Sequence, residues 1–111
     1  MNVEFVLILV TAADAAEAEL ISNTLVEKKL IACCNIVSPV SSIFHWKGKI
    51  DRETEILLIL KSVKNHFDQI ATEVQKLHSY ETPEIIAIPI VAGSEDYLNW
   101  IKNETKLDEW K

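Results

Sequence analysis

Two long β-rich segments meet at a single glycine, Gly48, near the middle of the chain. The first arm contains IVSPVSSIFHW and the second contains ILLIL and ends at Lys61, and the glycine between them is typical of a hairpin turn. Each arm has about 13 to 16 residues, which extend over roughly 45 to 50 Å as a strand. A globular chain of 111 residues has a diameter of only about 35 Å. The hairpin must therefore project beyond its own domain or bend sharply.

A projecting two-stranded ribbon is unstable alone and leaves sheet edges exposed, so it favours contact with further copies of the chain. Pro39 interrupts the first arm. Because proline cannot donate to a strand ladder, it predicts an edge position or a bulge there. Pro89 predicts an edge or the end of a strand for the same reason. We therefore expect a homo-oligomer whose contacts are made through strands.

The rest of the chain alternates between strand and helix patterns. The expected elements are a strand over 3–10, a helix over 14–29, a helix over 64–77, a strand over 84–90 and a helix that begins at Ser94. The first strand is expected to be central and buried on both faces, and not to be a signal peptide. Asp14 followed by Glu17 has the spacing of a helix cap.

Together with the hairpin, these elements give the order βαββαβ with an extra C-terminal helix. This order is typical of an α+β, ferredoxin-like sandwich, in which two helices cover one face of a four-stranded antiparallel sheet. The length predicts one domain over residues 1–111.

Composition argues against several classes of function. The net charge is −6 and lysine and arginine form no stripe, so a nucleic-acid partner is not expected. No run of about 18 apolar residues occurs, so a membrane span is not expected either. Cys33 and Cys34 are adjacent and point to opposite faces of a strand, which favours a reduced, intracellular compartment over a disulfide framework. The known nucleophile, phosphate-loop and zinc-protease motifs are absent, so we do not expect an enzyme.

The segment HSYETPE, residues 78–84, concentrates groups that bind metals. His78 and Glu81 supply an imidazole and a carboxylate, a pair that suits copper(II) or zinc. A protein site usually needs three or four ligands, so the others would come from elsewhere in the fold or from a second subunit. The alternative is that His78 ends a helix and interacts with its dipole. His45 is expected at a surface or interface, and His66 in solvent.

Further candidates have both a functional and a structural interpretation. Lys61 ends an apolar strand, where its ammonium either contacts an anion in a cleft or reaches solvent. Tyr80, Glu81 and Glu84 either share that polar cleft or form a solvated turn. The apolar and aromatic side chains that we expect to contact a neighbouring subunit are Phe44, Trp46, Trp100, Leu107 and Trp110.

Six blocks of the sequence resemble, in order and spacing, the CutA divalent-cation-tolerance family: VTAAD, LIACCNIV, SSIFHWKGKI, EILLILK, LHSYETPEIIAIPI and GSEDYLNWI. The resemblance covers residues 3–101, and HWKGKI and HSYETPEI are its most specific parts. It implies a ferredoxin-like subunit in a homotrimer, a cytoplasmic location and a role in tolerance of copper and other divalent cations. It implies no catalytic activity.

The resemblance also implies roles for particular residues. The side chains that it assigns to a cleft between subunits are Lys61, Tyr80, Glu81 and Glu84. It places Trp46 near an interface. Copper-binding relatives have a cysteine where this chain has Val10 and a further histidine where it has Leu77, so only His78 of that set is present. Copper(II) or another divalent cation is therefore the expected ligand. This chain has only part of the set of residues that binds copper in relatives.

Other proteins with this subunit architecture provide alternatives. PII-like signalling trimers bind nucleotides between subunits, but their long effector loop and basic phosphate site are not evident in this sequence. An acylphosphatase-like enzyme would need a phosphate-binding arginine, and the only arginine is Arg52, near the hairpin tip. A non-catalytic scaffold that anchors a partner protein is a further alternative, because fold alone does not determine function.

Overall fold

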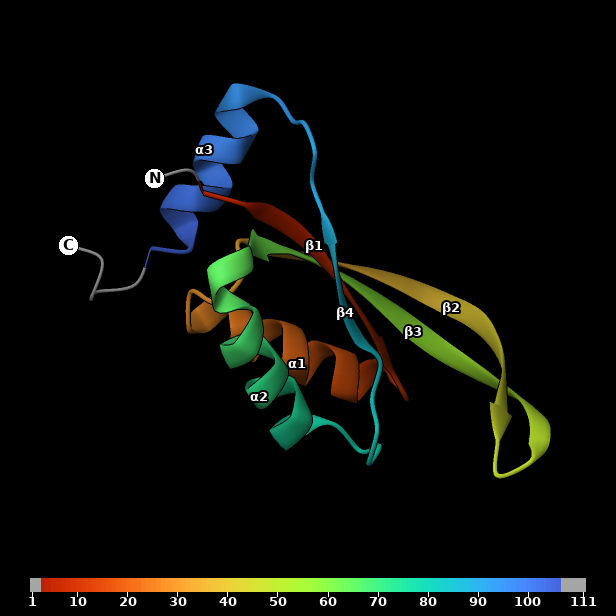
Figure 1. Ribbon diagram of the computed structural model, residues 1–111. Coiled ribbons are helices and arrows are strands. Elements are labelled where there is room, and N and C mark those ends of the chain that lie inside the picture. The colour runs from red at the N-terminus through yellow and green to blue at the C-terminus, as the bar shows by residue number, and fades with distance from the viewer. Residues whose placement is uncertain (1–2, 107–111) are drawn as a thin grey trace.

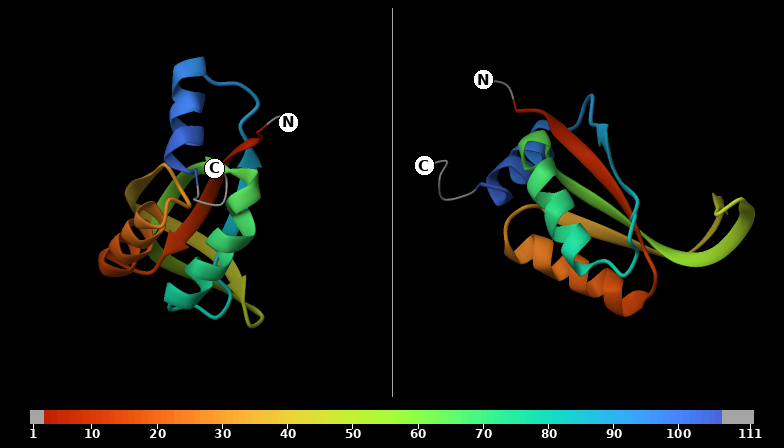
Figure 2. Two further views of the ribbon diagram at one scale, coloured as in Figure 1. Left: turned by 90° about the vertical axis from the view of Figure 1, so that its left-hand side faces the viewer. Right: turned by 60° about the horizontal axis from the view of Figure 1, so that its bottom comes forward.

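The computed structural model describes residues 3–106, which form an antiparallel sheet of four strands with three α-helices (Figure 1). The strands are β1 (Phe5–Ala12), β2 (Cys33–Trp46), β3 (Lys49–Val63) and β4 (Ile85–Pro89), in the spatial order β2-β3-β1-β4. The helices are α1 (Ala15–Glu27), α2 (Phe67–Leu77) and α3 (Glu95–Glu104). Figures 1 and 2 show α1 and α2 over the same face of the sheet. The predicted ferredoxin-like α+β fold with an extra C-terminal helix is confirmed.

β2 and β3 form the long hairpin that the sequence predicts. They contain 14 and 15 residues, and the turn between them places Lys47 and Gly48 at positive φ angles of 50° and 79°. The pairing register shifts between Val37 and Val40, so Pro39 lies at a bulge of an edge strand, as expected. The hairpin both projects and curves away from the helices (Figure 1), and the molecule measures 48 × 26 × 22 Å.

The core lies between the sheet and helices α1 and α2. Alternate residues of β1, such as Ile8 and Val10, are completely buried there, together with Ile21 of α1 and Ile70 of α2. The residues between them on β1 are only half-buried. The expectation that this strand is buried on both faces is therefore wrong for a single protomer, because the helices close only one face.

The second face of the sheet is apolar and largely uncovered in the protomer. Residues that pair directly across antiparallel strands share a face, and on this face Leu9 pairs with Ile59 and Ile86, while Leu7 pairs with Ile88. Ile86 and Ile88 remain 50% and 43% exposed. A contiguous apolar sheet face of this kind is typical of a surface that another molecule covers.

The first two helices form where the sequence predicts them, but the end of the first and the start of the second differ from the predicted bounds. The Asp14 carboxylate caps α1 by accepting a hydrogen bond from the Glu17 backbone N–H at 2.8 Å. The helix ends two residues before the predicted Lys29, which adopts a φ of 59°. The second helix starts with a 3-10 turn, Lys64–His66, before α2 begins.

His66 is buried, so the expectation that it is solvated is wrong. The residue is 2% exposed, and its ring Nε2 donates a hydrogen bond of 2.7 Å to the carbonyl oxygen of Thr105. This contact joins the start of the second helix to the end of α3, which is 39 residues away in sequence. A buried imidazole with a distant backbone partner has no local sequence signature.

α3 follows Gly93, which packs directly against it. A Cβ atom at this position would lie 2.9 Å from a methyl carbon of Leu98, so glycine allows the close approach. Ile101 of α3 is fully buried, whereas Trp100 is 40% exposed and its ring lies 5.4 Å from that of Tyr97 at a tilt of 36°. No helix among residues 3–106 is both long and apolar enough to cross a membrane. The expected docking residues Leu107 and Trp110 lie outside the described residues.

Candidate functional site

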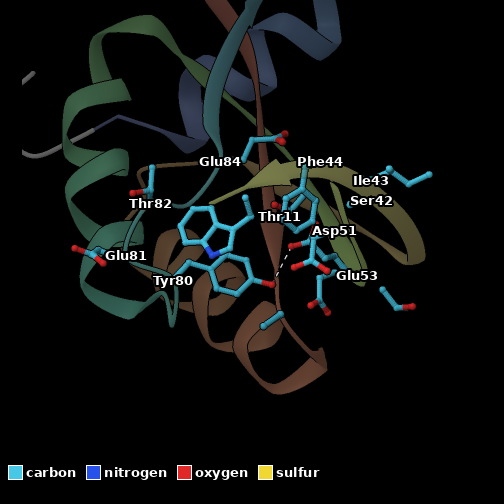
Figure 3. A pocket seen from close by; sticks show the side chains of 14 residues that line it. Thr11, Ser42, Ile43, Phe44, Asp51, Glu53, Tyr80, Glu81, Thr82 and Glu84 are labelled. Atoms are coloured by element: carbon cyan, nitrogen blue, oxygen red, sulfur yellow. Dashed lines mark hydrogen bonds between the residues drawn. The ribbon is translucent and has the colours of Figure 1, made fainter. Parts of the chain in front are cut away.

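A cleft of about 840 Å³ lies between the curved hairpin, the end of β1 and the turn that joins α2 to β4 (Figure 3). Its aromatic walls are formed by Phe44, Trp46 and Tyr80. Its carboxylates are those of Asp51, Glu53, Glu55, Glu81 and Glu84. No lysine, arginine or histidine is among the described residues that line it. The cleft therefore combines apolar walls with an excess of negative charge.

The strand register explains how the hairpin builds this surface. Phe44 pairs with Asp51, and Ser42 pairs with Glu53, so an aromatic ring and a carboxylate lie side by side on one face. Side chains alternate along a strand, so Glu55 follows Asp51 and Glu53 on the same face. The curvature of the hairpin then turns this face toward the α2–β4 turn, which contributes Tyr80 (Figures 1 and 3).

Glu55 and Tyr80 are joined by a hydrogen bond within the cleft. Glu55 is only 6% exposed, and the Tyr80 hydroxyl donates a hydrogen bond of 3.0 Å to its carboxylate (Figure 3). Burial, the hydrogen bond to Glu55 and the charges of Glu55, Glu53 and Glu17 together raise the pKa of Tyr80 to about 12. The phenol therefore stays neutral and acts as a donor to the carboxylate.

His78 positions the turn that carries Tyr80. Its Nδ1 accepts a hydrogen bond of 3.0 Å from the Tyr80 backbone N–H, so the ring proton must be on Nε2. Nε2 then donates to the carbonyl oxygen of Thr11 at 2.6 Å. Both ring nitrogens are thus engaged within the protomer, and the imidazole joins the end of β1 to the residue that lines the cleft.

Glu17 also holds the α2–β4 turn in place through hydrogen bonds. Its carboxylate accepts hydrogen bonds from the backbone N–H groups of Ala13, at 2.9 Å, and Ser79, at 2.7 Å. Burial tends to raise the pKa of Glu17, but these two hydrogen bonds and the nearby His78 ring outweigh it, so the pKa is lowered. Glu17 was expected only as part of a helix cap, and it proves also to connect α1 with the α2–β4 turn.

The expected metal pair His78 and Glu81 is not assembled as a metal site in the protomer. A metal would have to displace one of the two hydrogen bonds of the His78 ring. In Figure 3 the Glu81 side chain points away from the Tyr80 hydroxyl. No group of three or more histidine, cysteine, aspartate or glutamate side chains within residues 3–106 is arranged to hold a metal ion. Metal binding by this pair stays a prediction.

Lys61 does not line this cleft within the protomer, and its expected place beside Tyr80 in a cleft between subunits stays a prediction. Its ammonium donates to the side-chain oxygen of Asn35, and its neighbours across the sheet are Leu7 and Cys33. Lys61 is six positions after Glu55 on β3, which corresponds to about 20 Å along the strand. The protomer therefore groups Tyr80, Glu81 and Glu84 around one cleft and leaves Lys61 outside it.

A model of the CutA1 divalent ion tolerance protein family matches residues 6–104 of the chain. The chain belongs to the CutA1 family. It is 47% identical over 94 residues to the divalent-cation tolerance protein CutA of Archaeoglobus fulgidus, covering 85% of this chain and 91% of that protein. It is 38% identical over 98 residues to the CutA of Thermus thermophilus, covering 88% and 95%. It spans 58% of the length of the chloroplastic CutA of Arabidopsis thaliana, to which it is 36% identical.

Solved structures of CutA proteins show the same fold. The periplasmic divalent cation tolerance protein CutA of Archaeoglobus fulgidus superposes with a TM-score of 0.90 at 43% identity, over 92% of this chain and 99% of that one. The CutA1 of Oryza sativa superposes with a TM-score of 0.91 at 34% identity, over 95% and 96%. The predicted family is thus shown by both sequence and structure.

At two positions the residue of this chain was expected to differ from that of copper-binding relatives, and both residues pack in or against the core. Val10 is completely buried in the core cluster, and Leu77 is partly buried against it. Neither position faces the cleft, because neither is among the described residues that line it. Of the expected interface residues, Phe44 and Trp46 lie on the cleft wall while Trp100 lies on α3, and their contact with another subunit stays a prediction.

The carboxylates of β3 were not foreseen as site residues, although the sequence carries their signal. In DRETE, residues 51–55, acidic residues occupy every second position. On a strand this spacing puts Asp51, Glu53 and Glu55 on one face. What the sequence does not reveal is that Glu55 is buried, since that depends on the curvature of the hairpin and on Tyr80.

Proposed function

We propose that this member of the CutA1 family is a non-catalytic homotrimer that binds cations in the cleft and contributes to tolerance of divalent cations in the cytoplasm. The observation that supports this most strongly is a cleft lined by five carboxylates, with no basic side chain among its described lining residues. Carboxylate oxygens are suitable ligands for divalent cations, and a concave surface of one charge concentrates ions of the opposite charge. The matched relatives are named for tolerance of divalent cations, which agrees with this role.

The uncovered apolar sheet face and the projecting hairpin support the oligomeric part of the proposal. Burial of apolar surface contributes about 25 cal/mol per Å². Contact through this face would therefore stabilise an assembly, and a neighbouring subunit could complete the ligand set of the cleft. The two free cysteines, Cys33 and Cys34, are compatible with a reducing compartment.

Sedimentation analysis of the full chain at micromolar concentration tests the assembly. We expect the parent protein to be a trimer. Trp46 is 50% exposed in the protomer, and its replacement by alanine should raise the protein concentration below which the trimer dissociates. Glu27→Ala, on the exposed end of α1, is the control and should leave the assembly unchanged. A monomeric protein, or identical dissociation of Trp46→Ala and the parent, contradicts the proposed interface.

Calorimetric titration with copper(II) and with zinc tests cation binding. We expect binding that is weakened at least about tenfold in a Glu53→Gln/Glu84→Gln double variant, since each removed charge weakens attraction within the cleft. Glu27→Gln serves as the control for the general loss of negative charge. Absence of binding, or equal affinities of the double variant and the control, contradicts the proposal.

A His78→Ala variant locates the metal within the cleft. If copper(II) affinity is kept, the carboxylates bind the ion without the imidazole, as the two occupied ring nitrogens lead us to expect. A loss of copper(II) affinity together with an intact fold by circular dichroism shows that the His78 ring exchanges one of its hydrogen bonds for the metal.

A further inference from the structure

We infer that His78 is a positioning residue of the cleft, whose ring aims the Tyr80 phenol at Glu55 and so ties the β2–β3 hairpin to the body of the protomer. The inference rests on the proposed function in one respect only, namely that the cleft is the functional site. It adds the residue that sets the geometry of that site. Its test needs no cation, so the two proposals can fail separately.

The turn that carries Tyr80 is held by side chains. Among the described residues, no hydrogen bond between two backbone groups involves residues 79–83. Side chains take that role, and two of them hold the backbone N–H groups of consecutive residues. The Glu17 carboxylate accepts from Ser79 at 2.7 Å. The Nδ1 atom of His78 accepts from Tyr80 at 3.0 Å, so the orientation of the Tyr80 backbone depends on the imidazole.

The His78 ring is itself fixed by the sheet. Its side chain is completely buried, and Nε2 donates to the carbonyl oxygen of Thr11 at 2.6 Å. Thr11 pairs with Leu57 on the neighbouring strand, so this anchor belongs to the sheet and not to a loop. A ring that donates at Nε2 and accepts at Nδ1 cannot rotate without losing one of the two bonds. The imidazole therefore transmits the position of β1 to the backbone of Tyr80.

The phenol amplifies small movements of this backbone. A tyrosine oxygen lies about 6.5 Å from its own Cα, so a rotation of about 10° moves it by about 1 Å, enough to break a hydrogen bond. The Tyr80 hydroxyl lies 3.0 Å from the carboxylate of Glu55, which is 6% exposed (Figure 3). The next residue, Ile56, pairs with Ala12 at the end of β1. The hydrogen bond therefore fixes β3 at the point where the hairpin extends beyond β1.

A double-mutant cycle in urea unfolding of the full chain, at one fixed protein concentration, tests the inference. Two substitutions separate the two bonds of the ring. His78→Asn keeps an oxygen at the δ position that can accept from Tyr80, whereas His78→Gln places an amide at the ε position that can donate to Thr11. Each variant loses one bond, so both should be less stable than the parent. Tyr80→Phe removes the hydroxyl alone and keeps the ring, whose centre lies 4.8 Å from that of His78.

In the parent, Tyr80→Phe should raise the equilibrium constant of unfolding about tenfold, because a hydrogen bond to a buried carboxylate is lost. We expect about the same factor in His78→Asn and less than about threefold in His78→Gln, where the acceptor that aims the phenol is missing. Tyr97→Phe, on α3, is the control, and its effect should be equal in all three backgrounds. A Tyr80→Phe factor that is equal in all three backgrounds overturns the inference, because His78 then acts only on the stability of the fold. A factor that is lost in both His78 variants assigns the effect to packing of the ring and overturns it as well.

Nitrogen-15 NMR of the labelled parent protein checks the geometry without a substitution. At neutral pH the His78 ring should carry its proton on Nε2, and Nδ1 should show a coupling across the hydrogen bond to the Tyr80 amide. A ring with a proton on Nδ1 overturns the inference. If cations bind in the cleft but the cycle shows no coupling, the inference is wrong and the proposed cation site stands. If the cycle shows the expected coupling and no cation binds, His78 still positions Tyr80 and the proposed function is wrong.

Discussion

Replacing Glu17 with glutamine should destabilise the protein through the loss of hydrogen bonds outside the hydrophobic core. The carboxylate accepts hydrogen bonds from the backbone N–H groups of Ala13 and Ser79, and thereby connects α1 with the α2–β4 turn. Glutamine has one accepting oxygen, so it can keep one of the two bonds. Its amide group then faces the other N–H donor. The variant loses one charge-assisted hydrogen bond and leaves a backbone donor unsatisfied, which costs about 2 kcal/mol.

The assay is urea unfolding of Glu17→Gln and the parent at one fixed protein concentration, since oligomer stability depends on concentration. Glu19→Gln is the matched control, because Glu19 lies on the exposed side of the same helix. The control should change the free energy of unfolding by less than about 0.5 kcal/mol. A cost for Glu17→Gln that equals that of the control refutes the proposed role of the carboxylate.

The pH dependence of the same difference is a sharper test. The pKa of Glu17 is lowered from its ordinary value of 4.5, so its stabilisation is present above that value and is lost as pH falls through the folded-state pKa. The difference between the parent and Glu17→Gln should be constant from about pH 5 to pH 7 and shrink below about pH 4. A difference that stays unchanged or grows on acidification contradicts the assigned hydrogen bonds.

Two further predictions concern buried polar contacts. The Tyr80 phenol should ionise near its raised pKa of about 12. Its stabilising hydrogen bond to Glu55 should therefore be fully present below pH 10, the ordinary pKa of the phenol, and be lost as pH rises toward 12. Ultraviolet titration of the parent and Tyr80→Phe checks this, and a phenol with an ordinary pKa contradicts it. His66→Ala should cost about 2 kcal/mol of unfolding free energy, because the buried Thr105 carbonyl loses its donor; an unchanged urea midpoint contradicts the role assigned to His66.

The hairpin could be predicted because its information is local. Gly48 fixes the turn, the apolar runs on both sides fix the strands, and Pro39 fixes the bulge, since each acts through its own backbone. The same is true of the cap at Asp14, whose partner is three residues away. These features follow from local sequence, so the sequence also predicted the element order, whereas the family was predicted from the resemblance of six sequence blocks.

The features that sequence reasoning missed depend on contacts between distant segments. His66 was expected in solvent because it lies in the first turn of the second helix, but its ring contacts the carbonyl oxygen of Thr105, the residue that follows α3. Within the protomer the Lys61 side chain donates to Asn35 and lies outside the cleft that Tyr80 lines, so a cleft that joins the two across subunits stays a prediction. Glu55 resembles a surface residue in sequence, yet it is buried and bonded to Tyr80, a residue 25 positions away.

Anomalous X-ray diffraction from crystals of the assembled protein soaked in zinc tests the central claim most directly, because it locates the cation without a mutation. We predict an anomalous peak inside the cleft, bonded to carboxylate oxygens that include Glu53, Glu55 or Glu84 of at least one subunit. A peak at His45 or Cys33, with none in the cleft, would contradict the conclusion that this cleft is the cation site.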